Sequence, residues 1–114
     1  MLKQFNKVVG DAGEEKAVAY LKKHKYKIIK CKYTCKIGEI DIIAEYKDFV
    51  VFVEVKYRKD DSFGRPAEAV NSAKQHKIRR MAESYMLKFR VNKIPRFDVI
   101  EILGEEINHI EGCF

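Results

Sequence analysis

Three carboxylates and a lysine stand in two neighbouring segments that otherwise have the composition of buried strands. Glu39 and Asp41 follow Gly38 at the start of one apolar run, and Glu54 and Lys56 end the next. Carboxylates that face each other at close range destabilise a sheet unless a cation lies between them. Two such carboxylates suit Mg²⁺, which leaves its other positions to water and substrate phosphate. The pattern therefore predicts a magnesium site with a lysine beside it.

A short hairpin is expected to position these side chains. Ile40 to Tyr46 and Phe49 to Val55 are rich in Ile, Val and Phe, and Lys47-Asp48 between them is typical of a two-residue turn. The predicted pairs are Tyr46 with Phe49, Ala44 with Val51, Ile42 with Val53, Asp41 with Glu54 and Glu39 with Lys56. Because opposed residues have Cβ atoms about 5 Å apart, one cation could contact both carboxylates of the fourth pair.

The charged residues also have a simpler interpretation. Glu39 and Lys56 could form a cross-strand ion pair, with Asp41 and Glu54 flanking it at a solvated end of the sheet. Against this, the unbroken apolar run Phe49 to Val53 is typical of a strand buried on both faces. Charges beside such a strand require a compensating partner, and Glu54 and Lys56 leave the same face of it. We therefore favour the metal site.

Length and charge limit the class of protein. The chain has 114 residues, and we expect residues 1–114 to form a single domain. Its 23 Lys and Arg against 17 Asp and Glu give a net charge of +6, which favours polyanionic partners, nucleic acid first. No apolar run is long enough for a transmembrane helix, and a signal-peptide core is absent, so we expect a cytoplasmic protein without membrane contact.

The three cysteines do not predict a disulfide framework, because their number is odd. Cys31 and Cys35, together with His109 and Cys113, could be combined into a zinc site, but the flanking pattern of a zinc finger or ribbon is missing. We expect free thiols.

The rest of the chain alternates between helical and strand patterns. The predicted elements are a helix from Ala12 to His24, a strand from Tyr26 to Tyr33, a surface loop from Tyr57 to Arg65, a helix that ends at Phe89, a strand from Arg96 to Leu103 and a short strand from Ile107 to Ile110. The order helix, three strands, helix, strand predicts an α/β sandwich around a mixed sheet.

The second helix carries two further signals. Ser72 with Gln75 forms a capping-box pattern at its start. The apolar positions that repeat at helical spacing are Ile78, Met81, Ala82, Tyr85 and Phe89. Methionine and aromatic residues at that spacing are expected to face the core.

Five ordered motifs span nearly the whole chain and resemble the YraN family of small bacterial proteins. They are Gly10-x-x-Gly13-Glu14, Gly38-Glu39-Ile40-Asp41, Val51-Phe52-Val53-Glu54-Val55-Lys56-x-Arg58, Ala69-Val70 with Lys74, and Arg96-Phe97-Asp98-Val99. That family resembles a branch of the restriction-endonuclease-like, PD-(D/E)XK, superfamily and is similar in layout to archaeal-type Holliday-junction resolvases. The resemblance implies a three-layer sandwich with an α-β-β-β-α-β core and a Mg²⁺-dependent nuclease site.

The resemblance also implies roles for single residues. Asp41 and Glu54 would ligate Mg²⁺ or Mn²⁺, with the backbone carbonyl of Val55 as a further ligand. Lys56 would lie against the scissile phosphate and the attacking water. Glu14 matches the acidic residue on the first helix of resolvase-like proteins and would bind metal directly or through water; the alternative is a solvated helix residue.

Other residues of the motifs would support this site. Glu39 would be an ion-pair partner of Lys56 rather than a primary ligand. Arg58 and Lys74 are candidate phosphate contacts, and Lys74 gains from its place at a helix N-terminus. Asp98 belongs to a motif but is not needed for the chemistry, and we expect it to form an ion pair between neighbouring elements.

One position departs from related nucleases, which carry a Gln-x-x-x-Tyr pattern on the helix after the Glu-x-Lys strand. Here Gln75 is followed four residues later by Arg79. The role that the tyrosine has elsewhere is therefore not supplied in that way.

The function that these inferences favour is hydrolysis of DNA phosphodiester bonds by a metal-dependent endonuclease, with branched or damaged DNA as candidate substrates. One alternative is a module that binds nucleic acid, or acts as a scaffold, without turnover. A further alternative is an RNA-directed nuclease, since the metal site does not read the sugar and no aromatic stacking platform is evident. By analogy with resolvases, a homodimer would help so small a domain to hold two strands.

Overall fold

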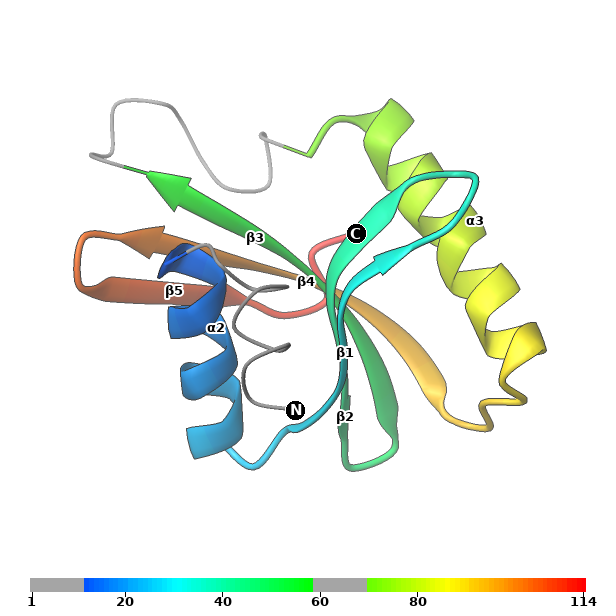
Figure 1. Ribbon diagram of the computed structural model, residues 1–114, viewed down its shortest axis with the longest axis horizontal. Coiled ribbons are helices and arrows are strands. Elements are labelled where there is room, and N and C mark those ends of the chain that lie inside the picture. Colours follow the sequence, from blue (N-terminus) through cyan, green and yellow to red (C-terminus); the bar gives the residue numbers. More distant parts are fainter. Residues whose placement is uncertain (1–11, 59–69) are drawn as a thin grey trace.

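The structure is a computed structural model that describes residues 12–58 and 70–114 (Figure 1). Its elements are α2 (Ala12–Lys23), β1 (Lys27–Thr34), β2 (Glu39–Tyr46), β3 (Phe49–Arg58), α3 (Ser72–Lys88), β4 (Ile94–Leu103) and β5 (Glu106–Ile110). In this part of the chain the strands form one sheet in the order β1-β2-β3-β4-β5. Only β3 and β4 pair in parallel, and α3 lies in the connection between them. Neither helix is long and apolar enough to cross a membrane.

The helices cover opposite faces of the sheet, which makes three layers (Figure 1). Alternate residues of β3 show this directly, because Val50 and Phe52 pack on the α3 side whereas Val51 and Val53 pack on the α2 side. The unbroken apolar run of β3 therefore reflects burial on both faces, as predicted. The predicted α/β sandwich with a mixed sheet is confirmed, and it is compatible with the restriction-endonuclease-like core.

Each face has its own core. The α3-side core consists of Ile40, Ile43, Val50, Phe52, Val70, Ile78, Met81, Ala82, Tyr85, Phe97 and Val99. The α2-side core consists of Ala17, Val18, Leu21, Tyr26, Ile42, Ala44, Val51, Val53, Ile100 and Ile102. The buried positions of α3 are the predicted ones, except that Phe89 caps the helix and keeps 43% of its surface exposed.

The hairpin of β2 and β3 has the predicted turn and, near the turn, the predicted register. Tyr46 pairs with Phe49, and the ladder continues to the pair of Ile42 and Val53. Lys47 closes the turn with a positive φ of 54°.

Beyond that pair the prediction is wrong, since the Asp41–Glu54 and Glu39–Lys56 pairs are not part of the ladder. The backbone N–H of Val55 donates to the Asp41 carboxylate at 2.8 Å, so a side chain takes the place of a ladder partner. The two strands therefore separate where the charges begin.

Several boundaries differ from the prediction by one or two residues, and two further differences bear on the site. β3 continues through Arg58, so Tyr57 and Arg58 belong to a strand and not to the predicted loop, whose remaining residues 59–65 lie outside the described residues, as does Gly10. The cap of α3 is Asn71 rather than Ser72, because Asn71 Oδ1 accepts from the backbone N–H of Lys74. Gln75 donates to the carbonyl of Val70 instead of closing a capping box.

The three cysteines are free thiols, as predicted. Cys31 packs against the α2-side core, whereas Cys35 and Cys113 pack against the α3-side core. The sheet therefore separates Cys31 from the other two, which removes the zinc site considered from the sequence.

Candidate functional site

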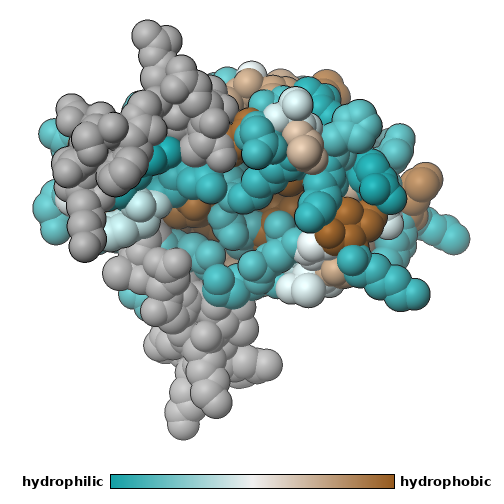
Figure 2. Space-filling model, turned by 90° about the horizontal axis from the view of Figure 1, so that it is seen from above, coloured by the Kyte–Doolittle hydropathy of each residue, from teal (hydrophilic) through white to brown (hydrophobic). Residues whose placement is uncertain are grey.

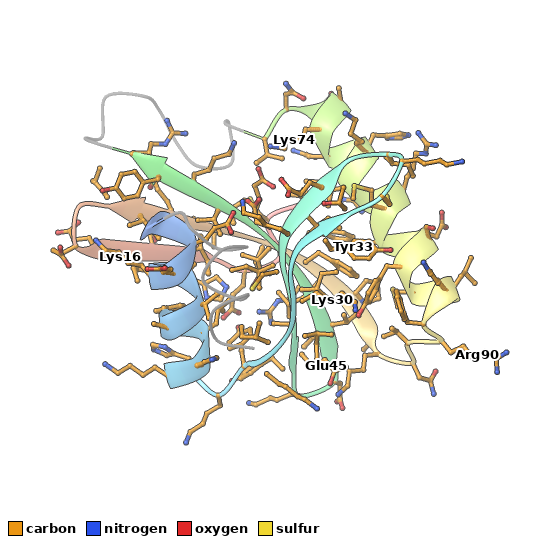
Figure 3. All side chains as sticks on the ribbon, viewed as in Figure 1. Lys16, Lys30, Tyr33, Glu45, Lys74 and Arg90 are labelled. Atoms are coloured by element: carbon orange, nitrogen blue, oxygen red, sulfur yellow. The ribbon has the colours of Figure 1, made fainter. Side chains whose placement is uncertain are left out.

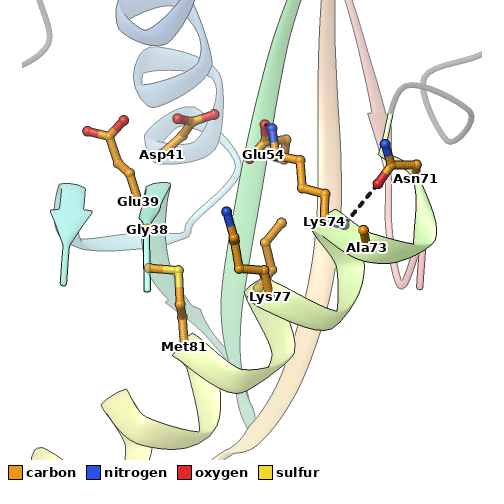
Figure 4. A pocket seen from close by; sticks show the side chains of 10 residues that line it. Gly38, Glu39, Asp41, Glu54, Asn71, Ala73, Lys74, Lys77 and Met81 are labelled. Carbon is orange, nitrogen blue, oxygen red and sulfur yellow. Dashed lines mark hydrogen bonds and ion pairs between the residues drawn. The ribbon is translucent and has the colours of Figure 1, made fainter. Parts of the chain in front are cut away.

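A pocket of about 470 Å³ lies where the start of β2, the second half of β3 and the start of α3 meet (Figure 4). Its lining consists of Gly38, Glu39, Asp41, Glu54, Asn71, Ala73, Lys74, Lys77, Ile78 and Met81. Hydrophilic residues cover most of the described surface at the end of the molecule that is seen from above in Figure 2. The separation of β2 from β3 leaves room for the pocket, and the first turns of α3 close one side.

The surroundings of Asp41 disfavour the charged form of its carboxyl group. Its Oδ2 accepts the hydrogen bond from Val55, which orients the carboxylate. Burial, followed by the nearby charge of Glu54, raises the pKa of Asp41 from 3.8 to about 7, although the Val55 hydrogen bond and Lys74 oppose the shift. A buried carboxyl whose pKa is raised in this way gains stability from an additional cation.

Glu54 is buried, with 6% of its surface exposed, and two lysines surround it. Lys74 Nζ lies 2.5 Å from Glu54 Oε2, and Lys56 Nζ lies 3.5 Å from the same oxygen. Burial tends to lower the pKa of Lys74, but the hydrogen bond to Glu54 and the charge of Asp41 outweigh it and raise the pKa. The ammonium of Lys74 therefore compensates part of the negative charge (Figure 4).

Glu14 is buried rather than solvated, which removes the alternative of an ordinary surface helix residue. Its Oε2 accepts from Lys32 Nζ at 3.0 Å, and this hydrogen bond raises the pKa of Lys32. The charge of Glu14 also contributes to the raised pKa of Asp41. Lys32 of β1 thus holds the buried carboxylate of Glu14 on α2.

The predicted supporting residues behave differently from one another. Glu39 is exposed at the pocket rim, and Lys56 is paired with Glu54 rather than with Glu39 in the described chain. The expected Glu39–Lys56 ion pair is therefore wrong, because the strands have already separated at this point. Arg58 Nε lies 3.0 Å from Glu101 Oε2 on β4, and its side chain is only 13% exposed. The ion pair of Arg58 therefore links β3 to β4, and its low exposure leaves little of the side chain accessible to a phosphate.

Asp98 lies outside this site, on the α2 face of the sheet, and is completely buried. Arg96 donates two hydrogen bonds to it, His109 Nε2 lies 2.6 Å from its Oδ2, and the backbone N–H of Gly112 donates to its Oδ1. Arg96 also donates to the Tyr26 hydroxyl at 2.7 Å. The ion pair of Asp98 with Arg96 lies within β4 and not between neighbouring elements as predicted, whereas the contact with His109 joins β4 to β5.

Three side chains near the pocket were not identified from the sequence. Lys77 follows Lys74 by three residues and so shares its side of α3, and Asn71 directly precedes the predicted cap. Lys77 could have been inferred from helical spacing, and Asn71 from the preference of asparagine for the N-cap position. Lys32 gave no local signal, since its partner Glu14 is 18 residues away on another element.

The carboxylates at the pocket determine whether a divalent cation fits there. In residues 12–58 and 70–114 no three His, Cys, Asp or Glu side chains gather closely enough to surround a metal ion. A complete protein cage is not required for Mg²⁺, which commonly uses one or two carboxylates plus water and phosphate. Asp41 and Glu54 both line the pocket and would be the carboxylates that fill that lesser requirement. Burial, followed by the charge of Glu54, raises the pKa of Asp41, and a bound cation would offset both effects.

Comparison with known proteins places this site in a family context. The family model of the uncharacterised protein family UPF0102 matches residues 13–102. The chain is 48% identical over 117 residues to a UPF0102 protein of Alkaliphilus oremlandii, covering 96% of this chain and 100% of that relative. It is 45% identical to one of Caldanaerobacter subterraneus, with both chains covered completely, and 48% identical to one of Clostridioides difficile, with 96% and 98% covered.

Proposed function

The chain belongs to the uncharacterised protein family UPF0102, the YraN family, and from its carboxylate pair we propose that it is a Mg²⁺-dependent endonuclease that hydrolyses DNA. The observation that carries the proposal is the pair itself: Asp41 and Glu54 line the same pocket, and burial together with the charge of Glu54 raises the pKa of Asp41. A protein that only needed stability would gain from a neutral residue at Asp41, whose charged form is disfavoured.

Asp41 and Glu54 would hold the metal, and the backbone of β3 prepares them for it. The Val55 N–H orients the Asp41 carboxylate, so that little side-chain motion remains to be lost on binding. The carbonyl of Val55 stays a candidate further ligand. When bound, Mg²⁺ would polarise the scissile phosphate and lower the pKa of an attacking water.

Lys56 would supply positive charge for the transition state. Its Nζ lies 3.5 Å from Glu54, so a phosphate held by the carboxylate-bound metal would come within reach of its ammonium group. A preorganised ammonium stabilises negative charge that develops on the phosphate oxygens, and it favours a deprotonated water. Lys56 is therefore proposed to act on both.

Lys74 would change partners when substrate binds. Its ammonium now contacts the Glu54 oxygen that a metal ion would also use. Once the metal carries that charge, Lys74 is available for a phosphate at the N-terminal end of α3, where helix N–H groups also favour anions. Metal binding and phosphate binding would thus be coupled through Glu54.

The same contact favours a second candidate, a nucleic-acid-binding module without turnover. The two ammonium groups of Lys74 and Lys56 both lie against the single carboxylate of Glu54, so positive charge is present at this carboxylate even in the absence of metal. In this case the lysines would bind phosphate and the carboxylates would only position them.

A cleavage panel separates the two candidates. Linear, nicked, flapped and four-way-junction DNA, with matched RNA, is incubated with the protein in Mg²⁺, Mn²⁺ or chelator. We expect cleavage that requires metal and that is lost in Asp41→Asn and Lys56→Gln. Glu83→Gln is the matched control, since it removes an exposed carboxylate from α3 away from the pocket.

Two results would contradict the proposal. Cleavage that continues unchanged in both site variants would place the chemistry elsewhere. Binding of DNA with a steep salt dependence, without cleavage of any substrate in either metal, would favour the binding module.

A further inference from the structure

A line of lysines along α3 leads from the pocket to an exposed aromatic ring. We call Lys77, Lys88, Lys30 and Phe89 the α3 track. Lys77 and Lys88 are 11 residues apart on α3, which is three helical turns, so they lie on the same side of the helix. Lys30 comes from β1, which lies beside α3 in Figure 3, and Lys74 stands at the pocket end.

Phe89 is the aromatic end of the track. The residue is 43% exposed, although the sequence pattern predicted a core position. The ring centroid lies 4.7 Å from that of Tyr85 and 6.5 Å from that of Tyr33, so its orientation is supported from the protein side. Lys30 Nζ and Lys88 Nζ lie 4.9 Å and 5.5 Å from the same centroid. The two ammonium groups lie over the ring, so a base that stacks on Phe89 would take their place and leave them to the phosphates of the same strand.

The charge of the track is not neutralised by the protein. Among the described residues, no carboxylate forms an ion pair with Lys30, Lys77 or Lys88. The α3 carboxylate Glu83 lies on the opposite side of the helix by its spacing from Lys74. Glu45 of β2 is the nearby acidic group, and its charge acts on Tyr85. The excess of positive charge favours a polyanion over an apolar peptide.

The length of the track suits a short stretch of one strand. From Lys74 to Phe89 is 15 residues, or about 22 Å at the rise of an α-helix. That distance corresponds to about six stacked nucleotides of one strand. Stacking on Phe89 requires a base that is not paired, because a paired base has both faces covered by its neighbours.

We propose that the α3 track binds an unpaired strand of nucleic acid that continues from the pocket, with one base stacked on Phe89. This inference rests on the proposed function and specifies its substrate class: the strand near the cut is single-stranded for several nucleotides, as in a flap, gap or open junction. The platform was missed in the sequence because its rings come from β1 and α3, which are far apart in the chain.

The test uses the absence of tryptophan from the sequence. Phe89→Trp introduces a single indole at the platform, and Leu87→Trp introduces one at a residue that is 78% exposed on another side of α3. Each protein is titrated in chelator with a single strand of about 12 nucleotides, with a blunt duplex of the same length, and with an abasic strand. We expect the single strand alone to quench the emission of Phe89→Trp, and no strand to quench Leu87→Trp.

Affinity variants supply an independent readout that does not need the indole. Phe89→Ala is expected to weaken binding of the single strand about tenfold. The double variant Lys30→Gln with Lys88→Gln is expected to reduce the slope of log K against log salt concentration by about one. The control pair Lys23→Gln with Lys25→Gln removes the same charge from exposed positions at the end of α2.

The outcomes separate this inference from the proposed function. Equal quenching by the abasic strand, or equal affinities of wild type and Phe89→Ala, would overturn the track even if Asp41-dependent cleavage is observed. A shift of the Phe89→Trp emission with protein concentration alone would show instead that a second copy of the chain covers the ring, and would also overturn it. Specific single-strand quenching without any cleavage would support the track while contradicting the nuclease.

Discussion

Replacing Asp41 by Asn is expected to stabilise the metal-free protein at neutral pH. Asn keeps the oxygen that accepts the hydrogen bond from Val55 but removes the charge that Glu54 repels. A residue that lowers stability in this way is expected where a charge is retained for binding or catalysis.

The size of the effect follows from the pKa of Asp41, which is raised from 3.8 to about 7. A difference of about 3 units corresponds to about 4 kcal/mol, which is an upper bound because the pocket is open to water. We therefore expect a gain of about 1 to 2 kcal/mol in the free energy of unfolding, or about 4 to 8 °C in Tm.

The sign depends on pH in a defined way. Between pH 4 and 7 the folded state of the wild type binds more protons at Asp41 than the unfolded state does, so its stability falls as the pH rises. Asn does not titrate. The difference between variant and wild type should thus be small near pH 4, grow with pH and be complete above about pH 7.

Thermal unfolding in chelator at a series of pH values measures this difference, with Glu83→Gln as the control. The same scans in Mg²⁺ should raise the Tm of the wild type and leave that of Asp41→Asn unchanged, since only the wild type retains both carboxylates. The reasoning would be refuted if Asp41→Asn were less stable than the wild type at pH 8 in chelator, or if Mg²⁺ stabilised both proteins equally.

Three further predictions concern one buried ion pair on the α2 face of the sheet and two residues of the pocket. Asp98→Asn should cost about 3 kcal/mol in urea unfolding at pH 7, because it leaves Arg96 without its buried partner. In the wild type, the hydrogen bonds from His109 and Arg96 overcome the effect of burial and lower the pKa of Asp98, so its stabilisation should be lost only as the pH falls below about 4; loss near pH 6 would contradict this. Asn71→Ala should cost about 1 kcal/mol by removing the cap of α3, and Asn71→Asp should retain most of it in the same assay. Lys74→Met should lower the Mg²⁺ concentration that gives half of the thermal stabilisation, since its ammonium competes for Glu54; a higher concentration would show that the two do not compete.

The sequence was sufficient for the hairpin near its turn and for four of the charged residues that line the pocket, Glu39, Asp41, Glu54 and Lys74. The turn at Lys47-Asp48 determined the hairpin register as far as Ile42 and Val53, because pairing propagates from a tight turn with a period of two. Helical spacing likewise identified the buried side of α3. Both predictions rest on the spacing of residues along one or two neighbouring elements, and they are correct where contacts between those elements determine the structure.

The register failed at Asp41, where a side chain and not the backbone contacts Val55. No local pattern distinguishes that contact from a further ladder pair. Partners that depend on the relative placement of helices and strands were also missed, such as Lys32 for Glu14 and Glu101 for Arg58. Their positions follow from tertiary packing, which spacing along the chain does not encode.

The central claim is that Asp41 and Glu54 hold the metal for phosphodiester hydrolysis, and the single-turnover cleavage rate tests it most directly. Wild type and Glu54→Gln are compared in Mg²⁺ on the best DNA substrate of the panel, at enzyme concentrations that saturate binding for both. We predict that Glu54→Gln cleaves about 100-fold more slowly, or not at all, while it remains folded and bound. Equal rates for the two proteins would contradict the account.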